Sequence, residues 1–166
     1  EGTVARIGER AFQKCTALES VTVQAGVQTI GKCAFLNCSA LTRVELPDTL
    51  KSLGAGTFMQ CSALTEIELP LGLTELPNLV FNASGLRSIT VPEGVTTIGS
   101  AAFHGCYKVT EVVLPNTVTR LEDRVFYDCS SLTSITIPDG VTSIGPWAFA
   151  ECSNLTSVTI PASVTS

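Results

Sequence analysis

Apolar residues recur along the chain with a period of 22 or 23 residues. All seven phenylalanines share one column of this repeat, at successive spacings of 23, 23, 23, 22, 23 and 23 residues. A second column three residues later holds Cys in six units and Ser84 in the fourth. Self-similarity at this period predicts a solenoid, in which each unit is one coil packed on the next. The phenylalanine column is Phe12, Phe35, Phe58, Phe81, Phe103, Phe126 and Phe149.

The unit reads L-x-x-V-x-V-P-x-x-V-x-x-I-G-x-x-A-F-x-x-C-x-x, and its spacings predict local structure. The V-x-V step has period two, so that Ile67 and Leu69 face inward while Glu66 and Glu68 face outward, which is typical of a short strand. The following Pro ends that strand because it lacks the N–H donor. The A-F-x-x-C segment has near-helical spacing and predicts one helical or 3-10 turn. A bend is expected at the glycines of five units, Gly8, Gly31, Gly54, Gly99 and Gly145.

One coil alone buries too little apolar surface to offset the cost of ordering it, so the coils must stack. We therefore expect residues 1–166 to form a single solenoid of about seven coils, with no internal domain boundary. The first and last units show no polar capping repeat, which a solenoid needs for solubility. From this we expect the sequence to be an excerpt of a longer protein.

The columns closely resemble the BspA-like, or treponemal-type, leucine-rich repeat over nearly the whole chain. The resemblance implies an α/β solenoid, a right-handed horseshoe with short parallel strands on the concave face and helical or 3-10 turns on the convex side. It also implies a bacterial surface or secreted protein, since some members are adhesins for host matrix proteins, and it transfers no catalytic residue. The alternative fold is a parallel β-helix, in which A-F-x-x-C would be a third strand.

The fourth unit departs from the pattern. Its FNASGL stretch lacks one residue and the Cys, and Pro77 replaces the glycine of the bend. These changes predict altered coil geometry between residues 77 and 86. Glu122 occupies the same glycine position in a later coil and is a milder change.

Composition and charge exclude several classes of function. Apolar residues make up 45% of the chain and charged residues 15%, which argues against disorder. A net charge of -5 has the wrong sign for nucleic acid or an anionic membrane, and no apolar run is long enough for a membrane-spanning segment. With His104 as the only histidine and no G-x-S-x-G motif, a set of nucleophile, base and orienting residue cannot be assembled in the usual way. We expect no enzyme activity, cofactor or metal.

The cysteine column admits two interpretations. Stacked coils lie about 4.8 Å apart, which a disulfide tolerates. Like-facing thiols at an inward position are better explained as small buried hydrophobic groups. Cys33 lies in a different, variable column and is expected to face solvent; whether it is free or crosslinked stays open.

The outward positions of the predicted strands carry most of the information about function. Most of them are Ser or Thr, but carboxylates replace these residues in the middle coils. Glu45 and Glu68 should be neighbours in one row, where like charges destabilise a sheet. A calcium ion would need more oxygen ligands than three carboxylates offer. The candidate ligand-binding residues on the concave face are Arg43, Glu45, Glu66, Glu68, Thr90, Glu111 and Val113.

These features predict a non-enzymatic, adhesin-like module of a cell-surface or secreted protein. Its expected partner is a protein or glycoprotein, and host extracellular matrix proteins are one candidate class. The carboxylates of the module would select a basic patch on that partner. The alternative is a structural spacer that projects another domain from the cell surface. The oligomeric state is not indicated by the sequence.

Overall fold

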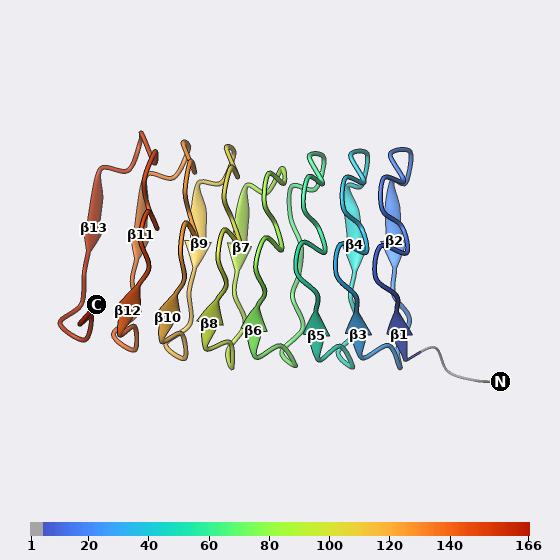
Figure 1. Ribbon diagram of the computed structural model, residues 1–166, viewed down its shortest axis with the longest axis horizontal. Coiled ribbons are helices and arrows are strands. Elements are labelled where there is room, and N and C mark those ends of the chain that lie inside the picture. The colour runs from blue at the N-terminus through green and yellow to red at the C-terminus, as the bar shows by residue number, and fades with distance from the viewer. Residues whose placement is uncertain (1–4) are drawn as a thin grey trace.

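The computed structural model describes residues 5–166 as a stack of similar coils along one axis (Figure 1). The N- and C-terminal parts of the chain lie at opposite ends of this axis. We number the coils by their phenylalanines, so that coil one contains Phe12 and coil four, residues 64–85, contains Phe81. The architecture is therefore the predicted parallel-strand solenoid of about seven coils.

The period-two segments form three-residue strands, which define the long-strand face. In β4, buried Val44 lies between exposed Arg43 and Glu45, as alternation requires. The strands that pair are parallel and in register, so that Ser20 lies opposite Arg43, while β9 and β11 of successive coils do not pair. They pair as β2–β4, β7–β9 and β11–β13. The strands are β2 (Ser20–Thr22), β4 (Arg43–Glu45), β7 (Ser88–Thr90), β9 (Glu111–Val113), β11 (Ser134–Thr136) and β13 (Ser157–Thr159).

A second row of strands, two residues each, runs along another side of the stack (Figure 1). They occupy the end of the V-x-x-I segment. The sequence predicted a bend after this segment and no strand within it. They pair in parallel as β1-β3-β5 and as β6-β8-β10-β12. They are β1 (Arg6–Ile7), β3 (Thr29–Ile30), β5 (Ser52–Leu53), β6 (Glu75–Leu76), β8 (Thr97–Ile98), β10 (Arg120–Leu121) and β12 (Ser143–Ile144).

The A-F-x-x-C segments are neither helical turns nor third strands, so the predicted helical or 3-10 turn was wrong. Each segment is a run of linked turns with two positive-φ residues, such as Cys33 (54°) and Asn37 (57°) in coil two. A right-handed helix cannot include residues of this conformation. The N–H groups of Cys33, Phe35 and Asn37 instead donate to carbonyls of coil three at 2.9, 2.9 and 2.8 Å. We call this third set of bonds between coils the turn ladder.

The recurring glycine of the unit lies where successive coils pack closely. A Cβ built on Gly54 would lie 2.2 Å from the backbone nitrogen of Lys32 in the preceding coil. The same addition at Gly31 would approach the nitrogen of Glu9 to 2.6 Å, whereas at Gly8 it would meet no atom within 4 Å. Gly31 and Gly54 are therefore required because a neighbouring backbone occupies the space of a side chain, whereas the same column holds Pro77 and Glu122 in two other coils.

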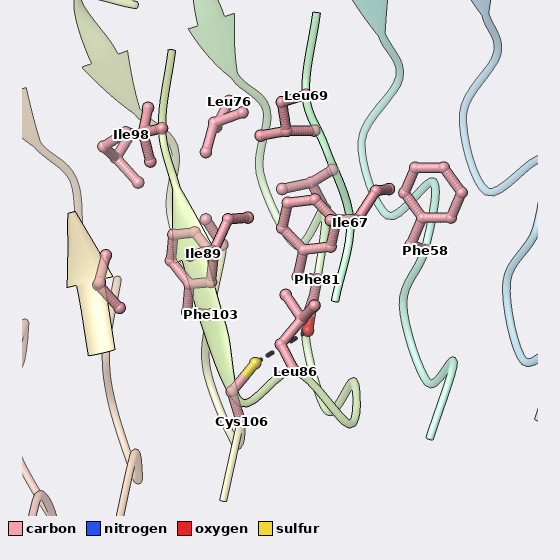
Figure 2. Close-up of a cluster of buried hydrophobic side chains, with 14 of the residues drawn as sticks. Phe58, Ile67, Leu69, Leu76, Phe81, Leu86, Ile89, Ile98, Phe103 and Cys106 are labelled. Carbon is pink, nitrogen blue, oxygen red and sulfur yellow. Dashed lines mark hydrogen bonds between the residues drawn. The ribbon is translucent and has the colours of Figure 1, made fainter. Parts of the chain in front are cut away.

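The interior is one cluster of buried apolar side chains that runs through the stack. Its axis is the phenylalanine column, in which successive rings are stacked with centroids 5.2 to 5.9 Å apart. Figure 2 shows Phe58, Phe81 and Phe103 lined up beside buried Leu and Ile side chains of coils four and five. This shared core confirms that neighbouring coils bury their apolar positions against one another.

The cysteine column contributes hydrogen bonds as well as apolar packing. The Cys106 thiol donates to the Phe81 carbonyl oxygen of the preceding coil at 3.1 Å (Figure 2), and Cys61 donates to that of Phe35 at 3.2 Å. Ser84 replaces Cys in coil four, and its hydroxyl lies 3.5 Å from the Cys106 sulfur. All seven cysteines are free thiols. Cys33 is half-buried, with its thiol 3.7 Å from the Ala55 carbonyl, contrary to the predicted solvent-facing position.

Coil four interrupts both rows of strands. The missing residue lies between Ser84 and Leu86, and Gly85 is consequently pressed against coil three, where a Cβ would lie 2.2 Å from the Ser62 carbonyl oxygen. Residues 66–68 are not in a strand, and the short strands do not pair between β5 and β6. The turn ladder continues across the same junction, with Phe58 N–H bonded to the Val80 carbonyl at 2.9 Å. The altered geometry predicted for this coil is therefore local to its strand sides.

Candidate ligand-binding face

The predicted ligand-binding residues lie on the long-strand face of coils three to six. Arg43 and Glu45 belong to β4, Thr90 to β7, and Glu111 and Val113 to β9. Glu66 and Glu68 lie in the non-strand segment of coil four and are exposed, with Ile67 buried between them. The inward–outward alternation thus persists in coil four although the ladder does not.

A surface depression of about 980 Å³ spans this part of the face. It brings together five of the predicted residues from three successive coils, and we call it the acidic groove. Glu111 and Val113 lie outside it, on the strand next to β7, with Val113 in register with Thr90. The groove is lined by Thr42, Arg43, Val44, Glu45, Glu66, Ile67, Glu68, Leu69, Leu71, Ser88, Ile89, Thr90 and Pro92.

A smaller depression of about 440 Å³ adjoins the groove and shares five lining residues with it. The shared residues include Glu45, Glu68 and Leu71, and the smaller depression adds Asp48 at its rim. Carboxylates therefore continue past the ends of the strands. The two depressions together form one acidic surface, on which apolar side chains lie between the charged ones.

The carboxylate of Glu45 is held by its own neighbours. The Thr22 hydroxyl donates to Oε2 at 2.8 Å, and the Arg43 guanidinium donates to Oε1. The Thr22 hydrogen bond and, after it, the Arg43 charge lower the pKa of Glu45 below its ordinary value. The Glu45 carboxylate is therefore bound by side chains of coils two and three. Glu45 and Glu68, which the sequence predicted as neighbours in one row, line the same two depressions.

Glu66 and Glu68 differ from Glu45 in having no cation of their own. Within residues 5–166, no Lys or Arg lies within salt-bridge distance of either carboxylate. In this described part of the chain, no backbone hydrogen bond joins residues 43–45 to residues 66–68. Between residues 65–69 and coil five, the described residues form one backbone hydrogen bond, from Arg87 N–H to the Thr65 carbonyl. The groove therefore presents two uncompensated charges on a segment with few ladder bonds.

Leu71 is a residue of this surface that the sequence analysis missed. Its side chain is 77% exposed and lines both depressions. The signal was present in the column after the prolines, where the other coils carry polar or small residues such as Asp48, Glu93 and Asn116. A large apolar side chain on the surface is ordinary by itself, but here it interrupts a polar column beside an acidic groove.

Residues 5–166 contain neither a metal-binding cluster nor a membrane-spanning helix. Among residues 5–166, no group of three or more His, Cys, Asp or Glu side chains is arranged to hold a metal ion. No helix in that range is long and apolar enough to cross a membrane.

A match to a protein-family model shows which family the chain belongs to. The BspA type leucine-rich repeat region, in six copies, matches residues 1–110 and 74–166. The chain belongs to the BspA-type leucine-rich repeat family. The resemblance noted from the unit sequence is thereby confirmed. No curated protein matches the chain.

Solved structures of bacterial leucine-rich repeat proteins match this member of the family closely. A leucine-rich repeat protein from Bacteroides ovatus is 38% identical, with a TM-score of 0.93 over 97% of this chain and 42% of its own. A leucine rich cell surface protein from Faecalibacterium prausnitzii is 39% identical, with a TM-score of 0.85 over 94% of this chain and 42% of its own. The T. pallidum leucine-rich repeat protein is 32% identical, with a TM-score of 0.84 over 92% of this chain and 72% of its own. The chain thus spans less than half the length of the first two structures.

Proposed function

We propose that this chain is a non-enzymatic protein-binding module of a surface or secreted bacterial protein. Its ligand is a protein or glycoprotein that docks on the long-strand face and presents a basic patch to the acidic groove. The observation that carries the proposal is the position of the groove, which lies where carboxylates replace the Ser and Thr of the repeat. The description of the Faecalibacterium relative as a cell surface protein supports the location.

The charge balance of the groove supports the choice of a basic partner. Arg43 forms an ion pair with Glu45, whereas no Lys or Arg of residues 5–166 forms one with Glu66 or Glu68. Complementary charge across an interface speeds association and selects among partners. A basic patch bound here would also supply the cations that these side chains lack among residues 5–166.

The proposal predicts that removing the carboxylates weakens binding. Glu45→Thr, Glu66→Ser and Glu68→Thr together restore the residue types of the other coils. The purified variant and wild type are compared for retention on a panel of extracellular matrix proteins, over a range of salt. We expect at least about tenfold weaker retention at low salt and a smaller salt dependence, because exposed charge attraction is screened by ions.

A charge-matched control removes three carboxylates away from the groove, by Glu75→Ser, Asp139→Ser and Glu151→Asn. Asn suits position 151, where φ is 62°. The control should bind as wild type does. Equal loss in both variants would show a dependence on net charge alone and would refute the groove as the site. Retention of no matrix protein by wild type would favour the structural spacer, the second candidate, which the end-to-end stacking of the coils suits.

A further inference from the structure

We infer that the acidic groove recognises an extended segment in which a large apolar side chain lies close to two cations, with Leu71 as the apolar contact. This inference rests on the proposed function and narrows it to a class of partner. It assigns a specificity role to a residue outside the rows of strand positions. The occupant is a basic–apolar peptide segment of a protein, as opposed to any basic surface.

The first argument is the place of Leu71. It lies three residues after Glu68 and lines both depressions together with that residue. Leu69 and Pro92 line the groove beside it, so that Leu71 extends an apolar area into the carboxylate surface. A ligand that fills the groove therefore meets charge and apolar surface within a few residues.

The second argument is that the fold does not require Leu at this position. The side chain is 77% exposed, and the same column holds Asp48, Glu93, Asn116 and Asp139 in other coils. An exposed side chain of this size contributes little to core packing, and it loses contact with water only when a partner covers it. Its contribution is therefore expected in binding and not in stability.

The third argument is the spacing of the charges. Glu66 and Glu68 are two residues apart and both face outward, with buried Ile67 between them. Alternate side chains of an extended peptide also face one side, about 7 Å apart. Two Lys or Arg residues separated by one position can pair with both carboxylates, and an apolar residue a few positions further along then reaches Leu71. Contact between one leucine and Leu71 removes on the order of 60 Å² of apolar surface from water, which corresponds to about tenfold in affinity.

The test uses three synthetic peptides of twelve residues and the whole chain. The first peptide contains Lys-Ser-Lys-Ser-Leu, in which both Lys and the Leu face the same side of an extended chain. The second has Ser in place of Leu, and the third has Glu in place of both Lys. We expect wild type to bind the first about tenfold more tightly than the second, and the second more tightly than the third. Leu71→Asn should lower affinity for the first peptide to that for the second.

Asn116→Leu is the matched control, since it places the same leucine in the same column two coils away from Leu71 and outside the groove. It should leave all three affinities unchanged, and thermal unfolding of both variants should match wild type. If wild type binds both lysine peptides equally but prefers them to the glutamate peptide, the role of Leu71 is refuted and charge selection stands. If the lysine peptides have no advantage over the glutamate peptide, both the inference and the proposed function are refuted.

Discussion

Gly54 shows how strongly a single residue can depend on the neighbouring coil. Replacing it with Ala would place a methyl group 2.2 Å from the Lys32 nitrogen, so that one backbone must move. We expect Gly54→Ala to lower the free energy of unfolding by about 2–4 kcal/mol, as overpacking and backbone displacement do. Chemical denaturation monitored by circular dichroism measures the change.

Gly8→Ala is the matched control at the same position of the repeat, where the added methyl group would meet nothing within 4 Å. It should be neutral or slightly stabilising, because Ala reduces the entropy of the unfolded chain. Similar losses at both sites would show that the glycine column serves backbone conformation and not close packing.

At the scale of single residues, the sequence predicted which side chains are buried but not the backbone φ angles. Alternation placed Glu66 and Glu68 outside and Ile67 inside correctly, because burial follows side-chain chemistry. The positive φ angles of Arg10 and Trp147 could not be predicted, since neither residue type favours that region. Asn37, Asp128 and Gly105 do favour it, and their shared column could have revealed the linked turns.

Among the elements, coil four has the weakest connection to its neighbours on the strand sides. Amide hydrogen exchange should reveal this difference, because protection depends on the local free energy of opening. We expect amides of residues 65–69 to exchange at least about tenfold faster than those of residues 88–91, whose strand β7 pairs with β9. Mass spectrometry of peptic fragments provides the measurement.

The turn ladder of the same coil provides an internal reference. Phe58 and Phe81 N–H groups are both bonded to the next coil at 2.9 Å, so their amides should stay protected. Uniform protection through residues 65–69 would mean that the strand pairing is intact in solution and that the groove lacks its open backbone. Fast exchange in both segments would indicate that coil four is unfolded as a whole.

Sequence reasoning at the level of elements succeeded where residues repeat a local period and failed where coils create structure jointly. The three-residue strands follow from period-two alternation. Two-residue strands such as β3 and β5 have no local signature, because the hydrogen bonds that define them are made to residues 23 positions away. The turn ladder likewise consists of hydrogen bonds between coils, and these bonds use N–H groups that a helical turn would need.

The whole molecule carries a column of buried thiols along its axis, and this column predicts an alkaline loss of stability. Burial raises the pKa of Cys106 from 9.0 to about 11 and that of Cys61 to about 12, and it also raises the pKa of Cys129. Above pH 9 the unfolded chain releases these protons while the folded chain retains them. Stability should therefore be complete below pH 9 and fall by roughly 1.4 kcal/mol per pH unit for each thiol until the folded pKa is reached.

The measurement is the free energy of unfolding in denaturant at pH 8 and at pH 10.5, under reducing conditions. A variant with Ser at positions 61, 106 and 129 tests the cause, and Ser84 shows that the column admits this residue. The variant should lose less stability than wild type over the same interval. An identical decline in both proteins would assign the effect to other groups.

The turn ladder makes each coil a backbone module whose bonds to the next are the same from one junction to another. Recombination within the gene can therefore add or remove one whole repeat in frame, and the protein changes length while its interior contacts keep their type. Coil four is the exception, because its missing residue fits only against the coils that now flank it. Variation in length should accumulate on either side of this coil and carry the groove to different distances from the ends of the array.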